Sequence, residues 1–520
     1  MNMNYKSIIA LLTVSLVSTT VTAATYISVE DDAVYGALSR LEAEGVIKSG
    51  LLDTRPISRK EAYRLLHEAE ANSVSGSDFI KALVQSLKDR LGPEPAGKTQ
   101  VKPLDSAYAA YVHTNADVHA TTYANARENE QALNYNNNGE LYRRGSNERL
   151  GFFSRIEDWG PLSIEINPEY RYPSASYIGY SDALYSKEEL VAKKAYAVLD
   201  LGWDVVLGKD SQWWGPGYHG ALLMTNNAEP LTMLKLANPE PVHLPWIFDS
   251  LGPIRFTFFV TNLENTRSVP DPYLYGMRFD FKPSPYIDIA FEKTALVGGK
   301  GRPHDLKILL ESLISRTHGG QDYKSSNYVN IDDERAGLDI KVTIPWRIQP
   351  MQIYLEADGE DQSSRLPVPQ SWAFVEGIYL PRILGEERLD LRLEYATTQG
   401  RVLDPSIWYT HVDYTSYTYK GNIIGHHIGT NAEDIYAVIS YLIPGKNGRV
   451  FLSYDREKHN LQVSGSHETL DDITAGVKLS LTSRIEFLAS YSHGWLKNIG
   501  NISGPTVKLS EYETGIEYRF

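Results

Sequence analysis

The sequence has no cysteine among its 520 residues. This absence excludes disulfide bonds, thiolate metal sites and cysteine nucleophiles together. Long apolar runs are also missing: mean hydropathy is -0.32, and beyond the N-terminus no window approaches the roughly 20 apolar residues of a membrane-spanning helix. Positive charge is scarce, because 51 Lys and Arg face 65 Asp and Glu, for a formal net charge of -14. Nucleic-acid binding needs a basic surface, so no nucleic-acid partner is expected.

Residues 1–24 have the layout of a cleaved secretory signal peptide. Lys6 supplies the positive start, residues 8–17 form a short apolar core, and residues 21–24 are small enough for a cleavage site. The apolar core is too short to span a bilayer. We expect export, and the alternative is a retained N-terminal anchor helix.

Residues 25–92 follow the apolar period of α-helices. Capping motifs begin at Ser28 and Ser58, and a third helix begins near Ser77. Three short amphipathic helices make a marginal core, so we expect this bundle to dock on a larger body. Residues 93–103, rich in proline and glycine, are the expected linker.

The helical segment has a second interpretation. Residues 41–66 weakly resemble half of an S-layer-homology module, which would imply contact with a cell-wall polymer. A generic three-helix cap explains the same pattern and is the interpretation that we favour.

Over residues 104–520 the apolar period changes to 2, which is typical of β-strands. Residues 162–172, 277–282, 338–344 and 389–395 each alternate apolar with polar or charged side chains. A strand with one apolar face is half-buried, and either a second sheet or lipid can cover that face. The alternatives are therefore a soluble protein of packed sheets and a transmembrane barrel.

Three features favour the barrel. Short and long connections alternate, as in outer-membrane barrels with tight periplasmic turns and extended outer loops. Tyrosine and tryptophan recur near strand ends, where a membrane interface would lie. The last strand alternates apolar residues and ends on Phe520, which looks like the signal that barrel-assembly machinery reads. We expect an all-β transmembrane antiparallel β-barrel over residues 104–520.

The strand count leaves one stretch open. Outside residues 208–253 we count about 16 candidate strands, an even number that returns the C-terminus to the periplasmic side. The same count puts both Leu207 and Ile254 at the periplasmic rim. The stretch is then either a luminal insertion or an extra strand pair, near residues 222–225 and 231–236, which would make about 18 strands.

Two unusual motifs lie in this stretch: WWGPG at residues 213–217 and NNA at residues 226–228. Together with a proline-rich segment and LPWIFDSLGP at residues 244–253, they resemble the signature of the capsule assembly Wzi family of outer-membrane proteins. The helical N-terminus and the barrel that ends at Phe520 match the layout of the family. The resemblance covers essentially the whole mature chain.

The resemblance implies a barrel of about 18 strands, closed below by a small α-helical bundle plug and occluded by its own loops. It implies a non-enzymatic lectin that attaches or organises capsular polysaccharide or exopolysaccharide at the surface of a Gram-negative bacterium. The implied partners are that polysaccharide, outer-membrane lipid and lipopolysaccharide, barrel-assembly machinery through Phe520, and polysaccharide export machinery.

Sugars bind to aromatic rings and to amide, carboxylate and guanidinium groups. The candidate carbohydrate-binding residues are Trp213, Trp214, Tyr218, Asn226 and Asn227 in the central stretch, Trp408, Tyr409, Tyr414 and Tyr417 in the loop 408–419, and Arg143 and Arg144 in the outer loop 122–147. Each group has a structural alternative. The tryptophans can pack the lumen, the tyrosine loop can pack against other loops, and the arginines can meet lipid phosphates or solvent.

Other function classes fit less well. Asp210, Ser211 and His219 could form a hydrolytic set, but there is no Gly-x-Ser-x-Gly turn to present the serine. His426 and His427 lack a third ligand at a convincing spacing, so neither a metal site nor a cofactor is expected. The remaining alternative is a porin or polysaccharide-conducting channel, which would lack a plug.

Overall fold

The computed structural model describes residues 23–95, 97–123, 126–176, 184–186, 188–303, 306–315, 332–362, 369–402, 408–461 and 465–520. Almost all of the expected signal peptide, residues 1–22, lies outside the described part. Within these ranges we find no helix with the length and apolar character needed to cross a membrane.

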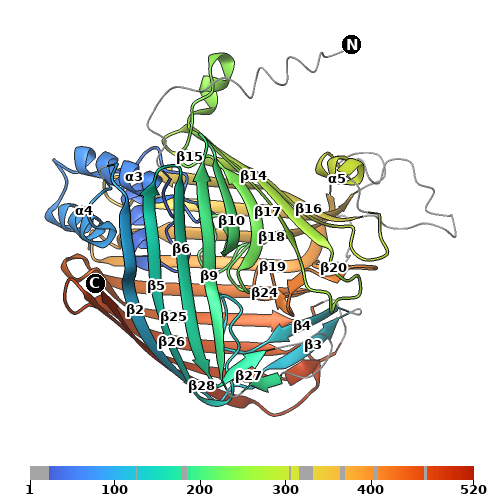
Figure 1. The fold of residues 1–520 in the computed structure, drawn as a ribbon. Coiled ribbons are helices and arrows are strands. Elements are labelled where there is room, and N and C mark those ends of the chain that lie inside the picture. The colour runs from blue at the N-terminus through green and yellow to red at the C-terminus, as the bar shows by residue number, and fades with distance from the viewer. Residues whose placement is uncertain are drawn as a thin grey trace.

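In the described part of the chain, 18 strands close into one antiparallel barrel (Figure 1). Each strand pairs with the next barrel strand along the chain, and the last one pairs with the first to complete the cylinder. The barrel strands are β2 (Gln100–Thr114), β5 (Gly145–Trp159), β6 (Leu162–Tyr172), β9 (Glu189–Asp200), β10 (Asp204–Asp210), β12 (Leu231–Ala237), β13 (Ile254–Asn262), β14 (Tyr273–Ser284), β15 (Ile287–Val297), β16 (Asp332–Ile344), β17 (Met351–Gln362), β18 (Pro369–Leu380), β19 (Leu389–Val402), β24 (Ala432–Ile443), β25 (Gly448–His459), β26 (Thr469–Ser480), β27 (Ile485–Lys497) and β28 (Val507–Arg519).

The outer wall of the barrel is apolar. Leu150, Phe291, Leu452 and Ile516, from four different strands, are between 48% and 55% exposed. The side chains that alternate with such residues point inward and are largely charged and buried, as Arg278 is. Because apolar side chains face out and charged ones face in, the barrel spans a membrane and the predicted transmembrane fold is confirmed.

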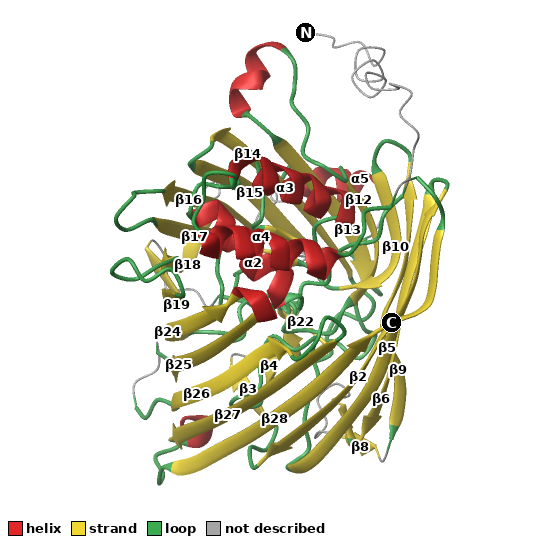
Figure 2. Cartoon of the chain, turned by 90° about the vertical axis from the view of Figure 1, so that its left-hand side faces the viewer, coloured by secondary structure: helices red, strands yellow, loops and turns green. Residues whose placement is uncertain are grey.

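The helical bundle lies across one opening of the barrel, which we call the helical end (Figure 2). It contains α2 (Asp32–Ala43), α3 (Arg59–Asn72) and α4 (Asp78–Leu91). The side chain of Ser58 caps α3 as the sequence predicts, and α4 begins next to Ser77 as predicted, with the Ser77 side chain as its cap. The first helix differs: its N-cap is Asp31 rather than Ser28, because the Asp31 carboxylate accepts the Val34 N–H.

Ion pairs join the bundle to the barrel wall. Arg90 of α4 lies 2.6 Å from Glu486 of β27, and Lys60 of α3 lies 2.6 Å from Asp200 of β9. The three helices also share their own apolar core. The bundle therefore closes the helical end as a docked body of its own.

The first barrel strand begins at Gln100, inside the segment expected to be a linker. Its register against β5 shifts between Lys102 and Ser106. Pro103 lies in that shift, where a residue without an N–H donor breaks no ladder hydrogen bond. The proline therefore marks a bulge in a strand and not the end of a linker.

The central stretch 208–253 contains both a luminal insertion and barrel-strand residues, the two alternatives that the sequence leaves open. Residues 211–230 enter the lumen as a loop, and β10 and β12 on either side of it are barrel strands. The expected strand at residues 222–225 is wrong, because Leu222, Leu223 and Met224 are at most 1% exposed and lie inside the barrel. That run is apolar at successive positions, which suits an enclosed segment and not a wall with two different faces.

Of the two residues expected at the rim, one lies there and the other does not. Ile254 begins β13 at the helical end, as expected. Leu207 lies in the middle of β10 and is 64% exposed on the wall, so its expected place at the rim is wrong. The sequence pattern therefore does not identify β10 as a strand of the barrel wall.

The remaining elements are short; β1 lies in the helical segment, and the others lie in the connections between barrel strands. They are β1 (Thr54–Arg55), β3 (His119–Tyr123), β4 (Ala126–Glu130), β7 (Ser174–Ser176), β8 (Leu184–Ser186), β11 (Trp213–Trp214), β20 (Thr410–His411), β21 (Thr415–Ser416), β22 (Thr418–Tyr419), β23 (Asn422–Ile423), α5 (Leu306–Leu313), and the 3-10 helices η1 (Trp246–Leu251), η2 (Pro444–Lys446) and η3 (Ile499–Asn501). The β3–β4 and β20–β21 hairpins lie at the opening opposite the helices, which we call the loop end (Figure 1).

Candidate functional site

Two segments fill the lumen from the loop end. Residues 211–230 connect β10 to β12, and residues 408–431 belong to the connection between β19 and β24. Their apolar side chains form one buried cluster with residues of the barrel wall, and this cluster includes Trp214, Leu223 and Tyr417. We call these two segments the loop plug.

The two tryptophans of the central stretch pack deep in the lumen. Trp214 is fully buried, with its ring centroid 5.4 Å from that of Phe259 at 64°. Trp213 is 6% exposed and packs against Val29 and Ala221. Both tryptophans belong to β11, which pairs with β1 of the helical segment, so they link the loop plug to the bundle. Neither indole ring reaches the surface of the loop end.

The surroundings of Gly215, which follows the two tryptophans, require a glycine at that position. Gly215 has a φ of +132°, and a Cβ built on it would lie 2.5 Å from a carboxylate oxygen of Glu356. Its N–H donates to the Asp53 carbonyl at 2.9 Å. The WWGPG motif therefore serves a close approach of the luminal chain to the wall and to the helical segment.

Tyr218 lies on the helical side of the loop plug. Its hydroxyl accepts a hydrogen bond from Arg449 at 2.6 Å, and it lines a cavity of about 90 Å³ between the bundle and the wall. Its backbone N–H donates to Glu394 at 2.5 Å. Tyr218 is therefore remote from the other candidates at the loop end.

The aromatic loop 408–419 comes from the loop end, as expected, but folds inward. Trp408, Tyr409, Tyr414 and Tyr417 are all 0% exposed. The Tyr417 hydroxyl donates to the Leu223 carbonyl at 3.0 Å. The Tyr409 hydroxyl donates to the Leu222 carbonyl. These side chains hold the two segments of the loop plug together.

The asparagine pair connects the loop plug to a third loop, residues 131–144. Asn226 donates to the Asn136 carbonyl at 2.7 Å and accepts from the Asn138 N–H at 2.6 Å. Asn227 accepts from the Asn136 N–H at 3.3 Å and donates to the Ile423 carbonyl at 3.1 Å. Asn226 is buried, whereas Asn227 is half-buried.

Arg143 and Arg144 are exposed at the loop end. Arg144 lies 3.2 Å from Asp117, and both side chains are more than 60% exposed. Such an exposed pair is weak and leaves the guanidinium available to a ligand.

A cavity of about 50 Å³ opens among the loops of the loop end. Its lining is rich in amides, and it includes Asn227 together with residues that the sequence analysis did not select: Asn129, Asn134, Tyr135, Asn137 and Asn422. The available signal was the run NYNNN at residues 134–138, which has no helical or strand period and is dense in side chains that bind hydroxyl groups.

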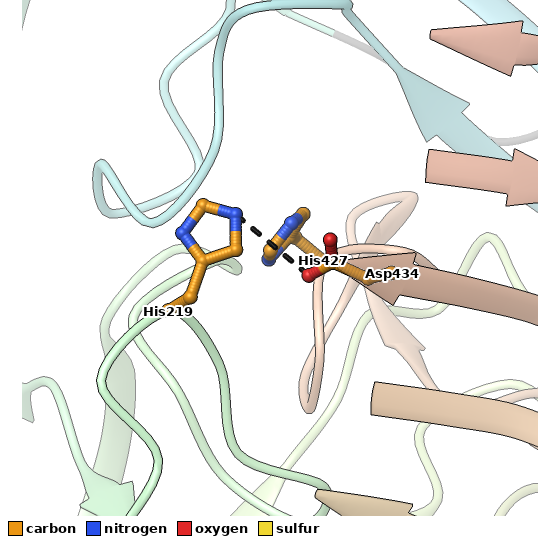
Figure 3. Close-up of side chains that lie close together, drawn as sticks. All are labelled: His219, His427 and Asp434. Carbon is orange, nitrogen blue, oxygen red and sulfur yellow. Dashed lines mark ion pairs between the residues drawn. The ribbon is translucent and has the colours of Figure 1, made fainter. Parts of the chain in front are cut away.

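A pair of histidines, one of which lines this cavity, lies close to Asp434. His427 lines the cavity, and His219 lies beside His427, with ring centroids 4.6 Å apart. Asp434 faces both, and the ligand atoms of these three residues all lie within 4.8 Å of one another (Figure 3). Burial lowers the pKa of His427, which keeps its imidazole in the neutral form that binds metals. His219 and Asp434 thus lie close enough to His427 to act as further metal ligands, which the spacing along the sequence does not reveal.

The residues considered as a hydrolytic set do not assemble into one. The Ser211 hydroxyl donates to Asn138 at 2.5 Å, and His219 Nε2 lies 3.0 Å from Asp455. Among the described residues, no hydrogen bond joins Ser211 to His219. This geometry is not that of a Ser-His-Asp triad.

A sequence profile of the family described as capsule assembly protein Wzi matches residues 114–506. The chain belongs to the capsule assembly protein Wzi family. As a Wzi-family protein with this closed barrel, it is an outer-membrane β-barrel. With an even number of strands, both ends of the barrel sequence lie on the same side of the membrane, at the helical end, and the loop end lies on the opposite side.

Two relatives extend the Wzi comparison. An uncharacterized 55.8 kDa protein in the cps region of Klebsiella pneumoniae is 24% identical over 354 residues, which are 65% of this chain and 59% of that protein. The solved structure of Wzi from Escherichia coli, an outer-membrane protein involved in group 1 capsule assembly and a carbohydrate-binding β-barrel, has 19% identity and a TM-score of 0.70. That comparison covers 96% of this chain and 100% of the other, so the two share a fold throughout.

Proposed function

We propose that this Wzi-family barrel binds a capsular polysaccharide or exopolysaccharide at its outer face and attaches it to the cell surface. The observation that carries the proposal is the double closure of the lumen, by the helical bundle below and the loop plug above. A lumen filled in this way favours surface binding over the porin or channel alternative. The carbohydrate-binding barrel of Escherichia coli Wzi, which has the same fold, supports the same chemistry.

The amide-lined cavity is the proposed point of contact. At about 50 Å³ it is far smaller than the roughly 300 Å³ of sites that enclose a small ligand. A polymer would therefore lie across its mouth, with hydroxyl groups directed at Asn134, Asn137 and Asn227. Tyr135 at the same cavity offers an aromatic face to an apolar C–H surface.

The other candidate residues divide into two roles in this proposal. Arg143 and Arg144, which are exposed, would attract the carboxylates of an acidic polymer. The buried aromatics, such as Trp214 and Tyr417, would act indirectly by keeping the loop plug rigid and the cavity in shape. Preorganised loops bind with a smaller loss of conformational entropy.

Further partners are proposed from the rim of the barrel. Phe520 is 61% exposed and its N–H donates to the Asp105 carbonyl of β2 at 3.0 Å, so its ring is presented beside the closing strand pair. That placement suits contact with barrel-assembly machinery. Lipopolysaccharide would surround the apolar wall, and polysaccharide export machinery would meet the helical end.

The test combines a cellular and a binding measurement. We expect deletion of the gene to leave polymer synthesis intact while polymer is released into the medium, and loss of synthesis itself would contradict the proposal. In parallel, the purified chain is passed over immobilised capsular polysaccharide of the same strain. Asn227→Ala with Asn137→Ala should weaken binding about 30-fold, because each of the two lost hydrogen bonds contributes about 1 kcal/mol. Asn72→Ala, an exposed amide on α3, is the matched control.

A further inference from the structure

Four side chains from four separate segments converge below the amide-lined cavity. His219 comes from the first segment of the loop plug, residues 211–230, His427 from its second segment, residues 408–431, Asp434 from β24 and Asp455 from β25. His219 Nε2 lies 3.0 Å from Asp455 Oδ2. It lies 3.8 Å from Asp434 Oδ2 (Figure 3). Glu457 stands next to this set, 3.3 Å from His427 Nε2.

Several of the polar atoms that point into this cluster have no hydrogen-bond partner. In the described residues these are His427 Nδ1, Asp434 Oδ1 and Asp455 Oδ1, all of them buried. The His427 side chain is only 4% exposed. A buried polar atom without a partner costs about 1–3 kcal/mol. Three such atoms in one cluster indicate that a bound group satisfies them.

The charge of the cluster identifies what kind of group fits. Asp434 and Asp455 are 1% exposed, and among the described residues their ion-pair partner is His219, not a lysine or arginine. Glu457 adds a third buried carboxylate, although it also pairs with His459 at 3.0 Å. Buried carboxylates without full compensation favour a multivalent cation.

We propose that His219, His427, Asp434 and Asp455 bind one divalent transition-metal ion, with Zn²⁺ as the probe. Two imidazoles and two carboxylates are a donor set that suits zinc. With bonds of about 2.0–2.2 Å, the ligand atoms of a tetrahedral site lie about 3.3–3.5 Å apart. The distances of 3.0 Å and 3.8 Å around His219 Nε2 bracket this spacing.

The surroundings hold the two imidazoles in place. The His219 ring stacks on Tyr436 with centroids 3.7 Å apart, and its backbone N–H donates to Glu394 at 2.6 Å. The His427 ring stacks on Tyr135 with centroids 4.6 Å apart. Such supporting contacts orient metal ligands. The ion would join the two segments of the loop plug and two wall strands at one point, beside the cavity.

The experiment uses the full chain, purified in detergent, treated with chelator and then titrated with Zn²⁺ by calorimetry. We expect one tight equivalent, and Co²⁺ in its place should give the visible absorption of a tetrahedral site. His219→Gln and His427→Gln should each weaken binding at least about 100-fold, since loss of a mere supporting partner already costs 10–100-fold. The exposed His243→Gln is the matched control and should bind as the native chain does.

The proposal is overturned if the native chain binds no stoichiometric Zn²⁺, or if the ligand variants bind it as tightly as the controls. Folding of each variant is checked by the heat-dependent shift of barrel proteins in gel electrophoresis. Asp434→Asn, which keeps the shape of the side chain and removes its charge, provides a second variant should a histidine substitution disturb folding. Because the probe is the metal alone, the result is independent of whether the barrel binds a polysaccharide.

Discussion

Lys282 of β14 lies 2.8 Å from the Glu42 carboxylate of α2, and both side chains are 1% exposed. Lys341 of β16 lies 3.0 Å from the same carboxylate. The helical bundle is therefore attached to the wall through charges that water does not reach. Lys282 also pairs with Asp288, and Lys341 with Asp53. Removing one member of a buried pair costs about 3–5 kcal/mol, and these remaining partners keep the cost of losing Glu42 at the low end of that range.

The first prediction concerns this attachment. Glu42→Gln should destabilise the docked bundle by about 3 kcal/mol, because two lysines lose a shared counter-ion. Limited proteolysis of the α2 segment measures the effect and should show faster cleavage while the barrel stays intact. Glu70→Gln, which removes an exposed pair with Lys88, should change cleavage little. Equal sensitivity of the two variants would argue against the buried network.

The second prediction concerns pH. Burial by itself raises the pKa of Glu42, but Lys282 and Lys341 outweigh burial and lower it from 4.5 to about 2. Since the folded pKa lies below the unfolded one, the stabilisation is complete above pH 4.5 and is lost as pH falls towards 2. Hydrogen exchange of α2 should accelerate across that window. In Glu42→Gln this acceleration should be smaller, and an unchanged profile would exclude Glu42 as its source.

The third prediction concerns the loop plug. Tyr417→Phe removes hydrogen bonds to the Leu223 carbonyl and to Thr294, each 3.0 Å long, from a fully buried hydroxyl. We expect a loss of about 1–3 kcal/mol, because both partners stay buried. Faster hydrogen exchange at residues 221–225 is the readout. Tyr111→Phe, on the exposed wall, is the control and should leave that exchange unchanged.

The fourth prediction is that the intact chain is electrically closed. In a planar bilayer the purified protein should show no steady single-channel conductance, because the bundle and the loop plug both obstruct the lumen. Deleting residues 25–92 should leave much of the obstruction in place, since the buried cluster of the loop plug contains no residue from the bundle. Steady conductance from the intact chain would favour the channel alternative over surface binding.

The candidate site could be predicted only in part. Asn227 was selected from the NNA motif and lines the cavity, but its neighbours Asn134 and Asn137 were not selected, because an irregular polar loop carries no periodic signal. Aromatic side chains such as Tyr409 have the chemistry for sugar binding and for packing alike. Their complete burial depends on how two distant loops fold into the lumen, which no local pattern records.

The sequence by itself determined the class of the protein. The period-2 alternation, the helical N-terminal segment and the aromatic end at Phe520 are local features, and a local pattern is enough to predict strands, helices and a lipid-facing wall. It also placed the cap at Ser58 and the helix start near Ser77, since a cap needs only three neighbouring residues.

Only the tertiary structure decided which segment of the central stretch crosses the membrane and which residues meet in the lumen. Residues 222–225 and strand β10 are both short, and each contains a run of three apolar residues. Only their surroundings make the first a luminal segment and the second a strand of the wall. In the same way, His219 and Asp434 lie far apart in the chain and come together because barrel closure and the inward fold of the loops set their neighbours. Contacts of this kind depend on the whole cylinder and not on spacing along the sequence.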